Sequence, residues 1–140
     1  MSESVRFHFD VDGENFTSAG QASVQVKKNL RQLGIPAEII RRVSIAMYEG
    51  EINMVIHAGG GRADVVVSES SINIILDDDG PGIADVELAM REGYSTAPDN
   101  IRSLGFGAGM GLPNMKRYTD KMDIDTAPGK GTRITMRVDM

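Results

Sequence analysis

Two pairs of short strand-like segments place the strongest constraint on how this chain folds. The first pair covers residues 63–68 and 71–77, and the second covers 122–126 and 132–139. The first pair is rich in valine and isoleucine, and the second alternates apolar and polar residues, as strands with one buried face do. A connection of a few residues makes two neighbouring strands antiparallel. Residues 127–131, which join the second pair, contain a proline and two glycines and read as a turn. Much of the sheet is therefore expected to be antiparallel.

A further strand and a first helix are expected before these two pairs of strands. A first strand is expected where Val5, Phe7, Phe9 and Val11 alternate with polar residues. Ser18-x-x-Gln21 is typical of a capping box and would begin a helix. The apolar face of that helix is expected to contain Ala22, Val26, Leu30 and Leu33.

A second helix is expected at 37–57, after Pro36 and before three glycines, and further helices at 85–92 and 111–120. Residues 94–106 have no periodicity and are expected to form a long loop. This order predicts an α+β protein, a two-layer α/β sandwich in which a mostly antiparallel mixed sheet carries helices on one face.

Composition narrows the classes of function. A chain of 140 residues is expected to form one domain over 1–140. Its formal charge of −5 disfavours nucleic acid and anionic membranes as partners, and the absence of cysteine excludes thiolate catalysis and cysteine-bound metals. No segment resembles a signal peptide or a membrane span, so a cytoplasmic protein is expected.

The second helix carries an acid and an amide inside its apolar stripe. At 100° per residue, Glu49 and Asn53 fall among Ile45, Ile52 and Ile56, whereas Glu51 points nearly the opposite way and is expected in solvent. Burial of such groups is unfavourable unless they face a polar cavity or a partner. Glu49 is therefore a candidate general base. The alternative is structural, with Glu49 paired to Arg42 and Asn53 capping a strand.

Two glycine-containing segments are candidate ligand sites. Asp78-Asp79-Gly80-Pro81-Gly82 follows a strand, and its glycines would let the backbone approach a flat ligand, although a plain surface turn has the same composition. Turn propensity leaves open which of its neighbouring aspartates points inward. Glycines 107, 109 and 111 lead into a helix whose first N–H groups attract phosphate, although such loops also serve as connectors. Neither a dinucleotide fingerprint nor a Walker loop is present.

These motifs, in this order, resemble the GHKL-type ATP-binding domain shared by histidine kinases, gyrase and MutL. The most similar group is that of the stand-alone anti-sigma-factor serine/threonine kinases of the stressosome switch type. Glu49-x-x-x-Asn53-x-x-x-His57 is similar to the N box of that family, and Asp78-x-Gly80-x-Gly82-Ile83 to its first glycine box. Gly107 to Pro113 resembles the second glycine box, and Gly129-x-Gly131-Thr132 the terminal motif.

The resemblance implies the Bergerat ATP-binding fold, ATP and Mg²⁺ as cofactors, and a role for each matching residue. Glu49 would be the base that takes a proton from a serine hydroxyl, and Asn53 would ligate Mg²⁺. Asp78 would accept a hydrogen bond from the adenine amine, with Thr132 near the adenine pocket. The other expected nucleotide contacts are Gly80, Gly82, Ile83, Gly107, Ala108, Gly109, Met110, Gly111 and Leu112.

The function implied is that of a Mg·ATP-dependent protein kinase acting on a small regulatory protein, such as a STAS-type antagonist. The alternative is an ATP-sensing binding module that controls a sigma factor or a redox or hydrogenase system without phosphoryl transfer. Related kinases often dimerise through the sheet edge or the first helix, so a homodimer is also an expectation.

Overall fold

The computed structural model describes residues 4–12, 20–83, 86, 90 and 111–140. Its sheet is built from strands in the order β1-β2-β3-β5-β4, and each of the four pairings is antiparallel. The α+β prediction is thus confirmed, and no parallel pairing joins the described strands. The strand bounds are Val5–Asp12 (β1), Gly60–Val67 (β2), Ser71–Asp78 (β3), Lys121–Thr126 (β4) and Thr132–Asp139 (β5).

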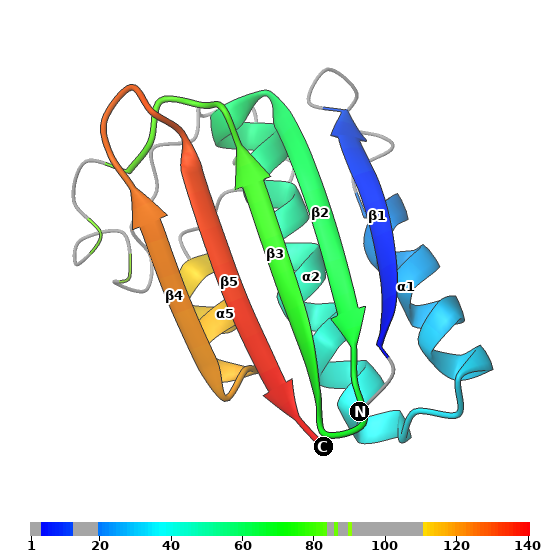
Figure 1. The fold of residues 1–140 in the computed structure, drawn as a ribbon. Coiled ribbons are helices and arrows are strands. Elements are labelled where there is room, and N and C mark those ends of the chain that lie inside the picture. The colour runs from blue at the N-terminus through cyan, green and yellow to red at the C-terminus, as the bar shows by residue number, and fades with distance from the viewer. Residues whose placement is uncertain (1–3, 13–19, 84–85, 87–89, 91–110) are drawn as a thin grey trace.

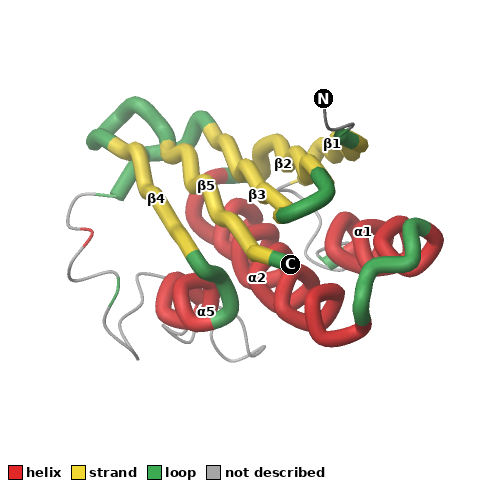
Figure 2. Tube along the Cα trace, turned by 60° about the horizontal axis from the view of Figure 1, so that its bottom comes forward, coloured by secondary structure: helices red, strands yellow, loops and turns green. Residues whose placement is uncertain are grey.

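The described helices all lie on one side of this sheet, as the two views in Figures 1 and 2 show. They are α1 (Gln21–Gln32), α2 (Ala37–Ala58) and α5 (Gly111–Arg117). The long α2 packs against both α1 and α5 as well as against the central strands. This central position means that opposite faces of α2 contact different helices, which decides where its polar side chains go.

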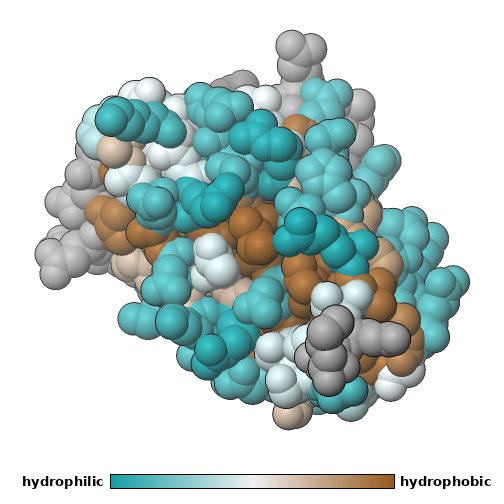
Figure 3. All heavy atoms as spheres, viewed as in Figure 1, coloured by the Kyte–Doolittle hydropathy of each residue, from teal (hydrophilic) through white to brown (hydrophobic). Residues whose placement is uncertain are grey.

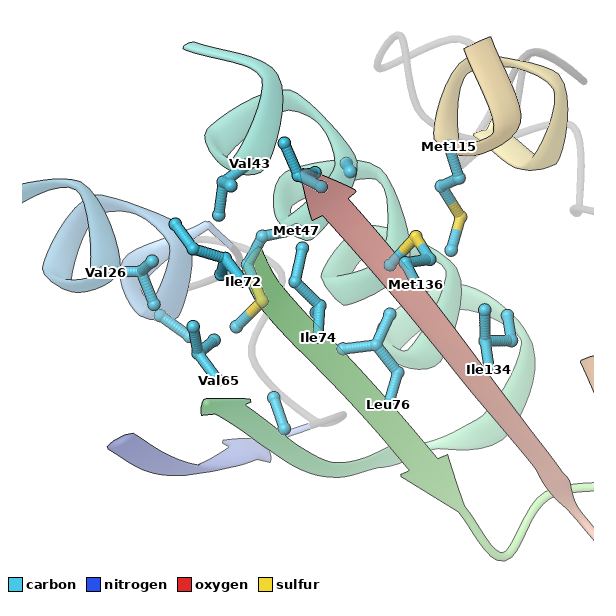
Figure 4. Close-up of a cluster of buried hydrophobic side chains, with 14 of the residues drawn as sticks. Val26, Val43, Met47, Val65, Ile72, Ile74, Leu76, Met115, Ile134 and Met136 are labelled. Carbon is cyan, nitrogen blue, oxygen red and sulfur yellow. The ribbon is translucent and has the colours of Figure 1, made fainter. Parts of the chain in front are cut away.

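The core fills the space between the two layers (Figure 4). Alternate residues of the central strands point into it, and the register places Val65 opposite Ile74 and Ile74 opposite Met136. Met115 of α5 points toward Met136, and each of these two methionines is completely buried. Burial of a side chain of this size contributes about 1.5–3 kcal/mol to folding. The helices therefore pack on the face of the sheet to which the alternate apolar residues point.

Helix boundaries agree closely with the local sequence signals for α2. The residue before its first turn is Pro36, and Gly59 follows its last turn with φ of 73°, a left-handed conformation that favours glycine. The other two helices are shorter than expected. Leu33 lies past the end of α1 and is 44% exposed, so it does not belong to the apolar face. α5 ends at Arg117 because Asp120 already donates its N–H to Arg137 of β5.

The opposite face of the sheet carries no described helix and is mostly hydrophilic, with apolar side chains gathered across its middle (Figure 3). The predicted Ser18 cap, the loop at 94–106 and most of the helix at 85–92 lie outside the described residues. Within that last segment, Met90 donates its N–H to Val86 O at 3.0 Å, one helical hydrogen bond. None of the described helices is both long and apolar enough to span a membrane.

Candidate functional site

The first part of the candidate site lies between α2 and α5. Glu49 and Asn53 are both half-buried and face α5, as their helical spacing predicts. Asn114 Nδ2 donates to Glu49 Oε1 at 3.3 Å, and Asn53 Nδ2 lies 3.9 Å from Met115 Sδ. A thioether is a weak acceptor, so this contact holds the Asn53 amide far less strongly than an oxygen acceptor would.

Gly111 allows α5 to approach α2 closely at this point. A Cβ atom at position 111 would lie 2.7 Å from Asn53 Nδ2, closer than real Cβ contacts, and 3.0 Å from Oδ1, so the Asn53 amide would have to shift. Two motifs 58 positions apart in sequence, the acid–amide pair and the last glycine of the second glycine segment, therefore meet in the fold. Gly107, Ala108, Gly109 and Met110 lie outside the described residues.

The structural alternative for Glu49 does not describe the observed contacts. Arg42 instead bonds the segment after α5, through Nε to Tyr118 O at 3.1 Å and through a terminal nitrogen to Asp120 Oδ2 at 3.2 Å. Asn53 packs on α5 and does not cap a strand. Leu112 has its side chain in the core at 8% exposure, and its contact with a ligand stays a prediction.

Glu51 is not in solvent, which corrects the sequence-based expectation. Its side chain is 3% exposed, and its carboxylate accepts three backbone N–H bonds at the start of α1, from Gly20 (2.9 Å), Ala22 (3.1 Å) and Ser23 (3.1 Å). The helical period gave the direction of Glu51 correctly, but the face opposite Glu49 packs on α1. The carboxylate satisfies N–H groups that a helix leaves without partners in its first turn.

The second part of the site is the turn after β3. The structure distinguishes the three aspartates there, which turn propensity left undecided. Asp77 bonds Arg133 at 2.9 Å, and Asp79, 85% exposed, bonds Arg62 at 3.2 Å. Asp78 is the last residue of β3, and its Oδ1 accepts from Gly80 N in the turn (2.9 Å) and from Thr132 N of β5 (3.2 Å). These bonds engage Oδ1 and leave Oδ2 as the second acceptor of that carboxylate.

Three glycines in and opposite this turn let neighbouring backbones pack directly on one another. A Cβ at Gly82 would overlap Ala127 O, and one at Gly131 would overlap Asp78 O. Both glycines also have positive φ, 79° and 81°. At Gly80 an added Cβ would lie 2.6 Å from the Cβ of Ala58. The turn is therefore pressed against the C-terminal end of α2.

Hydroxyl groups complete this part of the site. Ile83 donates its N–H to Thr126 Oγ1 at 2.9 Å, and Thr126 Oγ1 lies 2.9 Å from Thr132 Oγ1. Thr132 is 8% exposed, so its role in contacting a ligand remains a prediction. Nearby at the end of α2, burial lowers the pKa of His57 from its ordinary value of 6.5.

The two parts of the site are arranged along one helix. Asn53 precedes Ala58 by five residues, which is about 7.5 Å along the helix axis. An extended ligand with a flat group at the Asp78 turn and a charged group near Asn53 fits such an arrangement. The described residues hold no cluster of three or more histidine, aspartate or glutamate side chains able to bind a metal ion. Mg²⁺ with few protein ligands fits this donor set, because it is commonly held by one or two side chains together with substrate phosphates.

Sequence reasoning missed the contact of Asn114 with Glu49 and the burial of Glu51. A signal for Asn114 was available, since it lies three residues after Gly111 and helical spacing places both on one face of α5. Glu51 had no such signal, because its partner atoms are backbone N–H groups some 30 positions earlier in the chain.

Comparisons with known proteins place the chain in a family. Residues 38–140 match the family model described as "Histidine kinase-, DNA gyrase B-, and HSP90-like ATPase". An anti-sigma F factor of Clostridium novyi is 37% identical over 122 residues, which cover 83% of this chain and 82% of that protein. The serine/threonine-protein kinase RsbT of Bacillus subtilis is 30% identical over 118 residues, covering 81% and 83%.

A solved structure has the same fold. The mycobacterial sensor histidine kinase MprB aligns with a TM-score of 0.55 at 18% identity, covering 96% of this chain and 97% of that one. At this identity the likeness shows the fold alone. The family match extends from the start of α2 through both parts of the site. The chain therefore belongs to the histidine kinase-, DNA gyrase B- and HSP90-like ATPase family.

Proposed function

We propose that this protein binds Mg·ATP and transfers the γ-phosphoryl group to a serine or threonine hydroxyl of a small regulatory protein. The observation that carries the proposal is the position of Glu49 and Asn53, one turn apart on the face of α2 toward α5, with the Asp78 turn at the end of the same helix. The relatives support it, because they include a serine/threonine-protein kinase and anti-sigma factors. The whole chain would act as one domain, since β1 pairs with β2 and α1 packs on α2.

In this proposal each part of the site has a distinct task. Asp78 accepts the adenine amine through Oδ2, while its Oδ1 holds the turn. Asn53 would hold Mg²⁺ together with phosphate oxygens, and the ion would neutralise charge on the transferred group. Glu49 accepts the hydroxyl proton of the acceptor as the new O–P bond forms and ADP leaves. Such catalysis consists mainly of positioning and charge stabilisation.

The acceptor we propose is a STAS-type antagonist protein. The anti-sigma F factors among the relatives also favour a second function, in which ATP binding controls capture of a sigma factor without transfer. This alternative makes the same use of Asp78 and Asn53 but assigns no catalysis to Glu49. The two functions therefore differ in the role that they assign to a single residue, Glu49.

Calorimetry with ATP, with and without Mg²⁺, tests nucleotide binding, and transfer of radiolabelled γ-phosphate to each STAS protein of the same genome tests catalysis. We expect Glu49→Gln to keep ATP binding and lose transfer by roughly 100-fold or more. Asn53→Ala is expected to weaken binding of Mg·ATP itself. The absence of binding at millimolar nucleotide would overturn both functions, and binding without transfer to any acceptor would favour the switch.

A further inference from the structure

We propose that Asn114 is a positioning residue for Glu49, holding its carboxylate in the orientation in which it accepts the proton of the phosphoryl acceptor. This inference rests on the proposed kinase function and assigns a role to a residue outside the motifs that carry the family resemblance. Its basis is the hydrogen bond from Asn114 Nδ2 to Glu49 Oε1, 3.3 Å long and partly buried.

The chemistry of the two groups fixes the direction of this bond. An ionised carboxylate only accepts hydrogen bonds, so the amide must present its NH₂ group to Glu49. The amide is neutral, and unlike lysine or arginine it holds the carboxylate without pairing it to a full positive charge. The bond engages Oε1, and Oε2 is then the atom that receives the proton. The acceptor oxygen forms a bond to the γ-phosphorus, the bond from that phosphorus to the bridging oxygen breaks, and ADP leaves.

The helix that carries Asn114 is itself held firmly. The neighbouring Met115 is completely buried, which sets the rotation of α5 about its axis. Thr119 Oγ1 donates to Met115 O at 2.8 Å, and Arg42 of α2 bonds Tyr118 O just beyond the helix. At the other end of α5, Gly111 lies directly against the Asn53 amide. The Asn114 amide therefore reaches Glu49 from a preorganised position, as a supporting group must.

Two substitutions separate the hydrogen bond from simple packing. Asn114→Ala removes the amide, while Asn114→Asp keeps its shape but replaces the donor with a second carboxylate. Lys116→Ala is the matched control, since Lys116 is exposed on the same helix. All three are assayed by single-turnover transfer from Mg·ATP to the STAS protein that the wild type phosphorylates, beside ATP affinity and thermal unfolding.

We expect both Asn114 variants to lower the transfer rate roughly 10- to 100-fold, the range for loss of a hydrogen bond to a charged group, with ATP affinity within about twofold. Lys116→Ala should behave as wild type. A purely structural role would change the unfolding temperature and ATP affinity together with the rate. Wild-type transfer rates in both Asn114 variants, with Glu49→Gln inactive, would overturn this inference and leave the proposed function standing. An active Glu49→Gln would overturn the assignment of Glu49 as the base and this inference with it, while phosphoryl transfer itself would stand.

A second measurement does not depend on activity. The side-chain NH₂ signals of Asn114 in a nitrogen-15 NMR spectrum should shift in Glu49→Gln, because the charged acceptor is lost. Glu38→Gln, at an exposed position of α2, is the control and should leave those signals in place. Unchanged Asn114 signals in Glu49→Gln would show that the two side chains do not bond in solution and would sink the inference.

Discussion

At the scale of single residues, Glu51 shows how a carboxylate can be buried with no partner of opposite charge among the described residues. Its carboxylate is almost completely removed from water, which alone is unfavourable by several kcal/mol. Three backbone N–H groups and the positive end of the α1 dipole offset that penalty. The N-cap residue Gly20 has no side chain to cap α1, and the Glu51 carboxylate accepts first-turn N–H groups in its place.

Glu51→Gln should therefore destabilise the fold by about 2 kcal/mol, because the amide turns one acceptor into a donor that faces other donors. Urea unfolding measures this difference. The matched control, Glu38→Gln, changes an exposed pair with Arg41 and is expected to cost less than about 0.5 kcal/mol. Equal stabilities of the two variants would show that the Glu51 carboxylate does not cap α1.

A second residue-scale prediction concerns Asp78. Asparagine can keep the two bonds that Oδ1 accepts, but it places an NH₂ group where Oδ2 was. Asp78→Asn should change folding stability by less than about 1 kcal/mol and weaken ATP binding at least about 10-fold, since two donors would then meet. Calorimetry tests this against Asp79→Asn, at an exposed neighbour that bonds Arg62. An unchanged ATP affinity in Asp78→Asn would contradict the adenine assignment.

Residue directions were predictable where a single period governs them. The spacing of Glu49 and Asn53 placed both on one face of α2, and the structure has them there. The solvent-facing assignment of Glu51 was wrong, because a helical period gives a direction but not what lies in that direction. The choice among the three aspartates at 77–79 depended on Arg62, Arg133 and Thr132, which come from other strands.

At the scale of elements, the contact between α2 and the sheet depends on Gly50. A Cβ there would overlap Leu76 Cδ1, and Leu76 is 2% exposed with little room to move. Glycine inside a helix ordinarily costs about 1 kcal/mol relative to alanine. The missing side chain therefore serves the packing of helix on sheet and not the helix itself.

Gly50→Ala should consequently destabilise the protein by about 1–3 kcal/mol, despite the better helix propensity of alanine. Thermal or urea unfolding shows whether the substitution lowers or raises the folding stability. Combining it with Leu76→Val removes the overlapping atom, so the double variant should be more stable than the sum of the two single effects. A stabilised Gly50→Ala protein would mean that Leu76 moves aside freely.

Element boundaries followed the strength of local signals. Pro36 and Gly59 bracket α2 where the sequence indicates. α5 was predicted three residues too long, because the pairing of Asp120 with Arg137 begins β4 earlier than helix propensity alone suggests. The predicted capping box at Ser18 lies outside the described residues, and at the described start of α1 the Glu51 carboxylate accepts the backbone N–H of Gly20.

At the scale of the whole molecule, Asp120 joins three separate parts of the chain. Its Oδ2 accepts from Asp139 N at the end of β5 and from Arg42 of α2. The backbone N–H bond, followed by Arg42, lowers the pKa of Asp120 below its ordinary 3.8. The stability that this carboxylate contributes is therefore present above pH 3.8 and is lost as the pH falls through the lower folded value.

Asp120→Asn should then be less stable than wild type at neutral pH, and the difference should shrink as the pH drops below 3.8. Unfolding curves measured from neutral pH to below pH 3.8 test whether the stability difference shrinks toward acid. Asp123→Asn, at an exposed site of β4, is the control and is expected to stay close to wild type throughout. A difference that grows toward acid would contradict the assignment.

The two hairpins β2–β3 and β4–β5 and the layer of helices were predictable, because each hairpin is local in sequence. Placement of β5 between β3 and β4 was not, since it requires the chain to pass from β3 through α5 in the helical layer and to return to the sheet at β4 before β5 pairs with β3. The site depends on that crossing, because it brings Thr132 beside Asp78 and Gly111 beside Asn53.

The cap on α1 also has a consequence for hydrogen exchange. First-turn amides of a helix usually lack an acceptor and exchange rapidly with solvent. Here the amides of Gly20, Ala22 and Ser23 donate to a carboxylate that belongs to the central helix. These amide protons should therefore exchange with solvent only when α1 separates from α2. Their exchange rates then report how often that side of the molecule opens.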